Sequence, residues 1–189
     1  MGGADKGLVE FRGRPLVAYA LDALKQAAGP LLISANRNLD AYARFGVPVI
    51  TDRTDDFDGP LAGLLSAMEA AETDYVLTIP CDSPLLSGDL LGRLYTTLEQ
   101  EKAEICVAHD GGRMQPVFLI AKRVLIADLT EYLASGRRKV ETWLSSHQLA
   151  VADGSDHPEW FANINTLEEL ADWEAGDNIA SSDVIPNQR

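Results

Sequence analysis

Short apolar runs alternate with amphipathic segments along most of this sequence of 189 residues. Five runs predict β-strands: LLISA (31–35), PVIT (48–51), YVLTI (75–79), EICVA (104–108) and PVFLIA (116–121). Each run is almost continuously apolar, which is typical of strands that are buried on both faces of a sheet. We therefore expect a sheet that is covered by helices.

Four other segments carry the periodicity of amphipathic helices. The first follows Pro15, which suits the first turn of a helix, and the second follows the break at Gly59-Pro60. The third follows Ser87, a good N-cap residue, and the fourth begins with a capping box formed by Thr166 and Glu169. The apolar stripes are Val17, Ala20, Leu21, Leu24 and Ala28; Leu61, Leu64, Leu65 and Met68; Leu91, Leu94, Tyr95 and Leu98; and Leu167, Leu170 and Ala171.

This alternation predicts an α/β fold with a mostly parallel sheet, right-handed crossovers and helices on both faces. We expect one domain over residues 1–175. After Gly176 the sequence is polar and aperiodic, so residues 176–189 are predicted to form a disordered tail. Ligands of such sheets bind beyond the C-terminal ends of the strands, and we look for functional residues there.

Composition narrows the classes of function. The formal net charge of −13 disfavours nucleic-acid binding, and it requires that any phosphate-bearing ligand be held by local positive charge or by a metal ion. The sequence has neither an apolar run near the ~20 residues that span a bilayer nor a secretory signal at its start. Its two cysteines, Cys81 and Cys106, argue against a disulfide framework or a zinc site. We therefore expect a cytoplasmic protein without nucleic-acid or membrane partners.

The opening stretch, MGGADKG, has the composition of a phosphate-binding loop. Gly2 and Gly3 allow backbone N–H groups to turn toward an anion, and Lys6 adds a positive charge. Taken alone, these seven residues are explained more simply as a frayed terminus. The sequence contains neither GxxxxGK[ST] nor a complete GxGxxG, so the two common nucleotide fingerprints do not apply.

Two aspartates follow predicted strands. Asp82, in IPCDSP, lies just past a strand end, where a carboxylate can bind a magnesium ion that bridges substrate phosphates; alternatively, it caps the turn. Asp52 precedes a GPLAG run, and its carboxylate can accept the paired hydrogen bonds that guanine donates from N1 and N2. The alternative there is a solvated acidic loop, which is the interpretation we give to Asp55, Asp56 and Asp58.

Two further groups suit the binding of phosphates. Asn163 and Asn165 alternate in FANINTLEEL, so their side chains project from the same side of an extended segment and can orient phosphate or metal-bound water. Loop-forming asparagines before a helix are the commoner explanation. Arg137, Arg138 and Lys139 are consecutive cations in an acidic chain and suit the phosphate of a second substrate, although a solvated helix start is equally compatible with them.

Five segments occur together in a recognisable order: MGGADKGL, VITD, GPLAGL, PCDSP and NINTLEEL. With them the chain resembles the molybdenum cofactor guanylyltransferases, the MobA family of nucleotidyltransferases, from Met1 to about Trp173. The resemblance implies a Rossmann-like nucleotidyltransferase fold. It also implies transfer of GMP from GTP to molybdopterin, which forms the molybdopterin guanine dinucleotide cofactor and releases pyrophosphate, with Mg²⁺ as cofactor.

The resemblance assigns roles to residues of this sequence. Lys6 would contact the GTP phosphates, Asp82 would bind the metal near the α-phosphate, and Asn163 and Asn165 match an asparagine pair near the reacting phosphates. The nucleotide-binding set is Gly2, Gly3, Lys6, Ser34, Asn36, Asp52, Pro60, Leu61, Ala62, Gly63 and Asp82. Ser34 departs from the pattern, because we expect asparagine there in relatives. Arg137, Arg138 and the two asparagines are the residues predicted for the second substrate.

A second departure concerns the start, where the family pattern has a strand and an LAGG-containing loop before the methionine. We expect the strand to be missing from the middle of the sheet, which would leave backbone groups unpaired. Three alternatives stay open: a cytidylyltransferase for the same cofactor, a sugar-phosphate nucleotidyltransferase, and an impaired protein that binds nucleotide or partners without turnover. Expected partners are GTP, molybdopterin, cofactor-assembly proteins and molybdoenzyme-specific chaperones.

Overall fold

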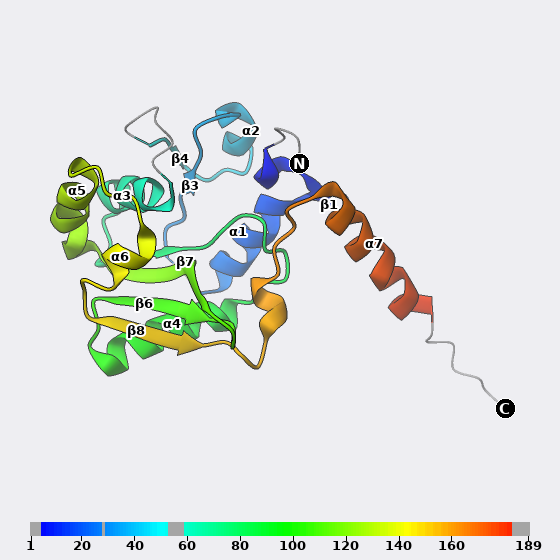
Figure 1. The fold of residues 1–189 in the computed structure, drawn as a ribbon. Coiled ribbons are helices and arrows are strands. Elements are labelled where there is room, and N and C mark those ends of the chain that lie inside the picture. Colours follow the sequence, from blue (N-terminus) through cyan, green and yellow to red (C-terminus); the bar gives the residue numbers. More distant parts are fainter. Residues whose placement is uncertain (1–4, 28, 53–58, 183–189) are drawn as a thin grey trace.

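The computed structural model describes residues 5–27, 29–52 and 59–182. Four strands form the larger sheet in the order β5-β7-β6-β8: β5 (Tyr75–Thr78), β7 (Met114–Lys122), β6 (Ile105–His109) and β8 (Leu149–Asp153). β6 and β8 are parallel, whereas β7 is antiparallel to both β5 and β6 (Figure 1). Three of the four strands therefore point in one direction, and their C-terminal ends share one edge of the sheet.

The sequence pattern did not predict two features of this sheet, the direction of β7 and the presence of β8. β7 reverses direction because only four residues, 110–113, separate it from β6, and a parallel neighbour would need a much longer crossover. β8 was not predicted at all. Its buried positions are Ala150 and Ala152, while Val151 is exposed, so its apolar signal is weak and partly on the wrong face.

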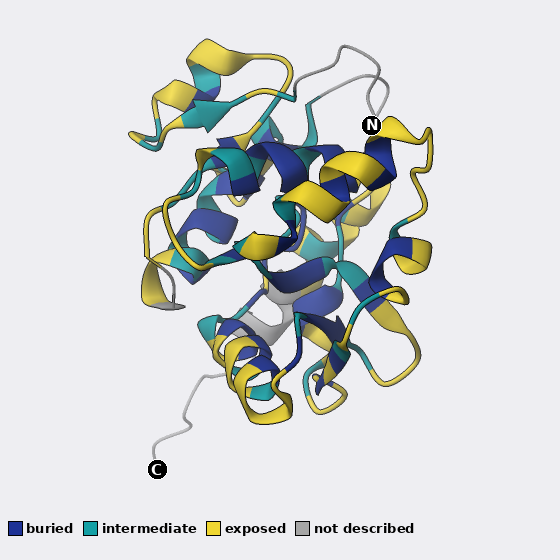
Figure 2. Cartoon of the chain, turned by 90° about the vertical axis from the view of Figure 1, so that its left-hand side faces the viewer, coloured by how far each residue is buried: buried dark blue, intermediate teal, exposed yellow. Residues whose placement is uncertain are grey.

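Helices cover both faces of the larger sheet, as predicted. α1 (Leu16–Ala27) and α4 (Gly88–Glu101) pack on one face, and α3 (Pro60–Ala70), α5 (Ile126–Ala134) and α6 (Val140–Leu144) pack on the other. Figure 2 shows that buried residues gather in the interior of the molecule and exposed residues on its outside. The predicted N-cap at Ser87 is confirmed, because its side chain accepts a hydrogen bond from the backbone N–H of Asp89.

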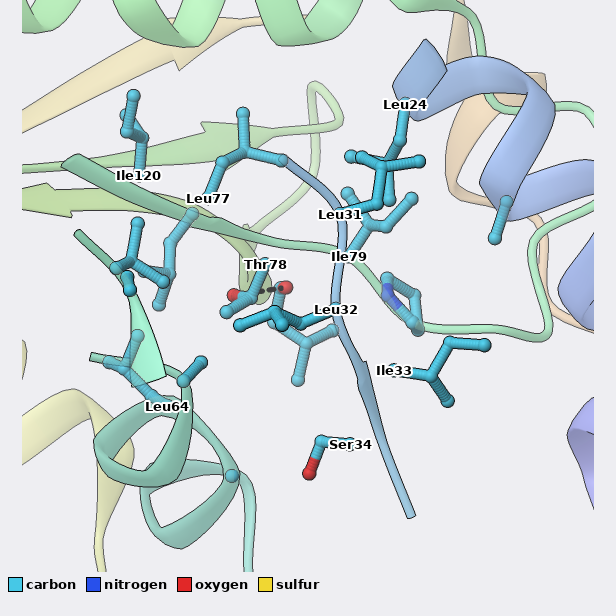
Figure 3. A pocket seen from close by; sticks show the side chains of 18 of the residues that line it. Leu24, Leu31, Leu32, Ile33, Ser34, Leu64, Leu77, Thr78, Ile79 and Ile120 are labelled. Atoms are coloured by element: carbon cyan, nitrogen blue, oxygen red, sulfur yellow. Dashed lines mark hydrogen bonds between the residues drawn. The ribbon is translucent and has the colours of Figure 1, made fainter. Parts of the chain in front are cut away.

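β3 (Ile33–Ser34) and β4 (Val49–Ile50) form a separate parallel pair beside α2 (Leu39–Ala43). An apolar groove of about 600 Å³ lies between this pair and β5. Figure 3 shows Leu31, Leu64, Leu77 and Ile79 around the groove, with Ser34 at one end. β3 and β5 are both edge strands of their own sheets, so the β3–β4 pair and the larger sheet are separate, and the groove lies between them.

The chain begins with the 3-10 turn η1 (Lys6–Leu8) and a hairpin of β1 (Glu10–Phe11) and β2 (Arg14–Pro15). Phe11 packs edge-on against Trp173 of α7 (Leu167–Ser182), which leads away from the body of the molecule (Figure 1). Two more 3-10 turns, η2 (Arg123–Leu125) and η3 (Pro158–Phe161), precede α5 and α7 respectively.

The capping box at the start of α7 is confirmed. The Glu169 backbone N–H donates to the Thr166 hydroxyl oxygen, and the Glu169 carboxylate accepts from the backbone N–H of Thr166. The helix continues through Gly176 to Ser182, beyond the point where the sequence pattern predicted a tail. A nucleated helix can extend past its packed face, because each added residue gains a backbone hydrogen bond. Residues 183–189 lie outside the described part of the chain.

Candidate functional site

Lys6 and Asp82 meet although 76 positions separate them in the sequence. The Lys6 ammonium lies 3.3 Å from the Asp82 carboxylate and donates a 2.7 Å hydrogen bond to the side-chain oxygen of Asn165. The Asp82 side chain is only 11% exposed, whereas that of Lys6 is 41% exposed. The cation therefore stands at the surface above a nearly buried carboxylate, which is a suitable arrangement for an anionic ligand that arrives from solvent.

The turn after β5 holds Asp82 in place. Pro80 ends the strand because it cannot donate to a sheet ladder, and the carbonyl of Asp82 accepts a 2.9 Å hydrogen bond from the backbone N–H of Ile164. Next to it, the buried Ser83 hydroxyl donates to the side-chain oxygen of Asn163. In the segment before α7, Asn165 therefore contacts Lys6 directly, whereas Asn163 is held beside Asp82 through Ser83. We call Lys6, Asp82, Asn163 and Asn165 the phosphate cluster.

Asn36 and Asp52 form a second group at the ends of β3 and β4. The Asn36 amide donates a 2.8 Å hydrogen bond to Asp52 Oδ2, and the Asp52 backbone N–H donates to the Asn36 side-chain oxygen at 2.9 Å. Asp52 Oδ1 is buried and has no hydrogen-bond partner among the described residues. A buried carboxylate oxygen without a donor is costly, so this atom is suited to accept a hydrogen bond from a ligand.

Gly63 of α3 faces this carboxylate. A Cβ atom on Gly63 would lie 3.4 Å from the Ser34 hydroxyl oxygen and 3.9 Å from Asp52 Oδ1. An added Cβ atom would be in ordinary van der Waals contact there, so the glycine keeps the helix surface beside the Asp52 carboxylate free of a side chain. Ser34, Asn36, Asp52 and Gly63 are called the base cluster below.

The rest of the GPLAG run forms the first turn of α3. Gly59 adopts φ +77° at the N-cap position, where a side chain would be strained, and Pro60 occupies the first turn. Leu61 and Ala62 are buried and anchor the turn in the core. Leu61 and Ala62 were predicted to contact the base, and because their side chains are buried, they present their backbone to the site.

Arg137 and Arg138 lie at the end of α5. The Arg137 guanidinium stacks 4.3 Å from the centre of the Tyr132 ring and donates to the Ser135 hydroxyl oxygen. Arg138 donates to the backbone carbonyl of Leu133 at 2.7 Å, and Lys139 is the N-cap residue of α6. These contacts place the basic segment against the C-terminal end of α5 and give no contact with the phosphate cluster.

Asp82 provides a donor set that fits a magnesium ion bound together with a nucleotide. Mg²⁺ is usually held by one or two carboxylates together with substrate phosphates and water. The phosphate cluster offers one carboxylate and two amide oxygens. The described residues contain no group of three or more His, Cys, Asp or Glu side chains that would hold a metal by themselves.

Sequence reasoning missed Asp5 and Tyr42. The Tyr42 hydroxyl donates a 2.6 Å hydrogen bond to the Asp5 carboxylate, next to Lys6. Asp5 stands in the quoted ADK stretch, but α2 is only five residues long and carried no recognised helix pattern. The predicted ligands Gly2 and Gly3 lie outside the described residues, as do Asp55, Asp56 and Asp58.

Cys81 borders the phosphate cluster but is unsuited to nucleophilic chemistry. Burial, reinforced by the neighbouring Asp82 carboxylate, raises the pKa of the Cys81 thiol to about 11. The thiolate is the reactive form of cysteine, so this group is protonated and reacts only slowly near neutral pH. Both Cys81 and Cys106 are free.

Solved structures place the fold among nucleotidyltransferases. Over 94% of this chain and 92% of the other, it superposes with a TM-score of 0.77, at 18% identity, on molybdopterin-guanine dinucleotide biosynthesis protein A from Archaeoglobus fulgidus. It also resembles 4-diphosphocytidyl-2C-methyl-D-erythritol synthase from Anaerococcus prevotii, with a TM-score of 0.74 at 14% identity over 93% of this chain and 92% of that one. The fold is therefore the Rossmann-like α/β fold of nucleotidyltransferases, as predicted.

Sequence comparisons define the family within this class. The MobA-like NTP transferase domain matches residues 1–151. Molybdenum cofactor guanylyltransferases from Cupriavidus pinatubonensis and Shewanella sediminis are 48% and 46% identical, over 93% and 89% of this chain and 90% and 86% of those relatives. The chain belongs to the molybdenum cofactor guanylyltransferases of the MobA-like NTP transferase family, and the resemblance noted in the sequence is confirmed. None of the helices in the described ranges combines the length and apolar character needed to cross a membrane.

Proposed function

We propose that this protein transfers the GMP part of GTP to molybdopterin, forming the molybdopterin guanine dinucleotide cofactor and releasing pyrophosphate. The observation that carries the proposal is the presence of two complementary clusters joined by one segment. The base cluster contains a buried carboxylate oxygen that has no hydrogen-bond partner among the described residues, and the phosphate cluster presents an exposed lysine. Residues 34–42 connect them, because Asn36 binds Asp52 while Tyr42 binds Asp5 beside Lys6.

At the base cluster, the geometry favours guanine. Asn36 occupies Asp52 Oδ2 and so fixes the carboxylate, which leaves Oδ1 to accept from the N1–H and N2–H groups of guanine. Cytosine presents a single donor on the corresponding edge, beside an acceptor that would face the carboxylate. Gly63 gives the flat base access to Asp52.

At the phosphate cluster, the chemistry needs alignment and charge stabilisation. A phosphate oxygen of molybdopterin attacks the α-phosphorus of GTP, the bond to the β-phosphate oxygen breaks, and pyrophosphate leaves. Lys6 binds the phosphates and stabilises the charge that develops on them, while Asn163 and Asn165 orient the reacting groups. A divalent ion held by Asp82, Mg²⁺ in our proposal, supplies further positive charge to the phosphates when it is bound.

The remaining predicted assignments belong to the same proposal. Gly2 and Gly3 provide backbone N–H groups to the phosphates, and Arg137 and Arg138 receive the second substrate. We propose a single catalytic domain over residues 1–175, located in the cytoplasm. Its protein partners would be cofactor-assembly proteins and molybdoenzyme-specific chaperones.

Pyrophosphate release tests the proposal against its alternatives. The protein is incubated with molybdopterin, Mg²⁺ and either GTP or CTP. We expect release with GTP that exceeds release with CTP, and a preference for CTP would replace the guanine assignment with a cytidylyltransferase. Tight GTP binding without release, with molybdopterin present, would favour a protein that binds nucleotide without turnover. Replacing molybdopterin by sugar phosphates tests whether the protein is instead a sugar-phosphate nucleotidyltransferase.

A further inference from the structure

The Asp5 side chain points away from the phosphate cluster, although Asp5 is the immediate neighbour of Lys6. Its carboxylate accepts hydrogen bonds from the Tyr42 hydroxyl at 2.6 Å and from the Asn38 amide at 3.0 Å, and it pairs with the Arg37 guanidinium at 3.4 Å. The Asp5 side chain is only 12% exposed. Three donors from one short segment therefore hold a nearly buried carboxylate, and such charge-assisted hydrogen bonds are among the stronger ones.

Tyr42 is anchored at the other end of this contact. It is 5% exposed and packs with Val17, Leu21 and Ile33 in the small core beneath α2. Burial, together with the hydrogen bond to Asp5, raises the pKa of the Tyr42 phenol well above its usual value. The hydroxyl is therefore protonated at any working pH and remains a donor to Asp5.

Gly7 is fitted to the same hydroxyl. A Cβ atom on Gly7 would lie 2.5 Å from the Tyr42 hydroxyl oxygen and 3.3 Å from Cys81 Sγ. A real side chain cannot approach so closely, so alanine at this position would displace either Tyr42 or the Lys6 turn. The backbone on both sides of Lys6 is thus set by Tyr42: Asp5 through a hydrogen bond, and Gly7 through close packing.

We propose that Asp5 and Tyr42 are positioning residues, which hold the Lys6 ammonium over Asp82 and tie that position to the base cluster. This inference rests on the proposed function. The connection runs from Asp52 to Asn36, along the backbone to Tyr42, and through Asp5 to Lys6. Neither positioning residue is expected to touch the substrates; both act through Lys6.

Removal of the hydroxyl should therefore affect the phosphates and not the base. In Tyr42→Phe, we expect kcat to fall roughly tenfold, because a misplaced lysine loses alignment in the transition state. Affinity for GTP should fall roughly fivefold, while affinity for guanosine, which has no phosphates, should stay unchanged. Tyr19→Phe is the matched control, since the Tyr19 hydroxyl donates to the backbone carbonyl of Phe11 away from the site.

A double-variant cycle isolates the packing contact. Gly7→Ala alone should lower kcat roughly 100-fold, but in the Tyr42→Phe background the added loss should be at most about tenfold, because the clashing oxygen is gone. Gly7→Ala combined with Tyr19→Phe should show simple additivity. Circular dichroism and the melting temperature of each variant show whether it is folded.

The outcomes separate the inference from the proposed function. Additive effects of Gly7→Ala and Tyr42→Phe, or equal losses of GTP and guanosine affinity in Tyr42→Phe, would overturn the positioning role. A wild-type protein that releases no pyrophosphate from GTP and molybdopterin would overturn the proposed function instead. In that case the GTP and guanosine affinities still decide whether Tyr42 positions Lys6.

Discussion

The larger sheet and the β3–β4 pair differ in how firmly each is packed. Among the described residues, the larger sheet lies between two clusters of 15 buried residues each. The core that includes β3 contains four buried residues, Val17, Leu21, Ile33 and Tyr42. An apolar groove of about 600 Å³ separates β3 from β5. The β3–β4 pair is therefore expected to open at a lower free energy than the larger sheet.

The two proposed halves of the site are divided between these regions. Asp82 follows β5 of the larger sheet, whereas Asn36 and Asp52 follow the strands of the smaller one. A nucleotide that contacts both would connect a firmly packed region to a loosely packed one. Its binding free energy would then add to the stability of the smaller region, because the ligand binds the assembled arrangement only.

We expect substitution of Asp82 to cause the largest loss of turnover. In Asp82→Ala, we expect metal-dependent turnover to fall by roughly 10³-fold or more, because the carboxylate is proposed to hold the metal at the reacting phosphates. Pyrophosphate release over a range of Mg²⁺ concentrations measures the effect. Asp156→Ala is the control, since this exposed carboxylate pairs with Arg93 and lies outside both clusters. Retained turnover in Asp82→Ala would remove Asp82 from its assigned role.

The two cysteines compare the regions directly. Cys106 lies in the core of the larger sheet, and burial raises the pKa of its thiol to about 12. Cys81 packs against the smaller core, and burial is the main reason that the pKa of its thiol is raised to about 11. Both thiols react as thiolates, and a thiol exposed by opening regains its ordinary pKa of about 8.5, so below about pH 8 each unit of pH should raise the alkylation rate about tenfold. We expect iodoacetamide to modify Cys81 roughly 100-fold faster than Cys106, because local opening exposes Cys81 alone.

Mass spectrometry of the modified peptides at pH 7 to 9 measures both rates. The Cys81→Ser variant should lose the faster reaction and keep its pyrophosphate release, since the thiol has no catalytic part in the proposal. Equal rates at the two cysteines would mean that both regions open together.

The larger sheet could be predicted from the sequence because its signals are local. The runs at 75–79 and 104–108 are apolar on both faces, and Ser87 is a recognisable N-cap residue for the helix that follows. The same holds for Thr166 with Glu169, whose capping box needs only a four-residue pattern. β8 escaped because its two buried side chains are alanines.

The site could be predicted in part, through motif order rather than periodicity. Lys6, Asp82, Asn163 and Asn165 do come together, although no local pattern connects positions so far apart in the sequence. Tyr42 could not be found in this way. Its role depends on a contact with Asp5 across 37 positions and on the space left by Gly7, and a five-residue helix gives little periodicity to detect.

Backbone hydrogen exchange measures the same difference in packing between the β3–β4 pair and the larger sheet. The N–H groups of Ile33 and Ala35 donate across the β3–β4 pair, to Pro48 and Ile50. We expect them to exchange roughly 30-fold faster than those of β6, equivalent to an opening free energy about 2 kcal/mol lower. GTP with Mg²⁺ should slow exchange at Ile33 and Ala35 and so reduce the difference in exchange rate between the two regions. Equal protection of the two regions without nucleotide would refute the proposed difference in packing.

Asp52→Asn gives the smallest expected effect and defines the base cluster. The change keeps the size of the side chain but can place an amide N–H where guanine also donates, so one hydrogen bond is lost. We expect GTP affinity to fall roughly tenfold, with kcat at saturating GTP reduced less than threefold. Equilibrium dialysis with GTP and CTP measures the change, and Asp40→Asn, on the exposed first turn of α2, is the control.

The preference between nucleotides decides the meaning of this result. If Asp52 accepts from guanine, the variant should lose affinity for GTP while its affinity for CTP stays the same or rises, since an amide can donate to the cytosine acceptor. An equal loss for both nucleotides would indicate that Asp52 only supports the fold of the smaller sheet. Asp52 would then belong with Asn36 to the structure of β3 and β4, and base selection would depend on the backbone of the Gly59–Gly63 turn.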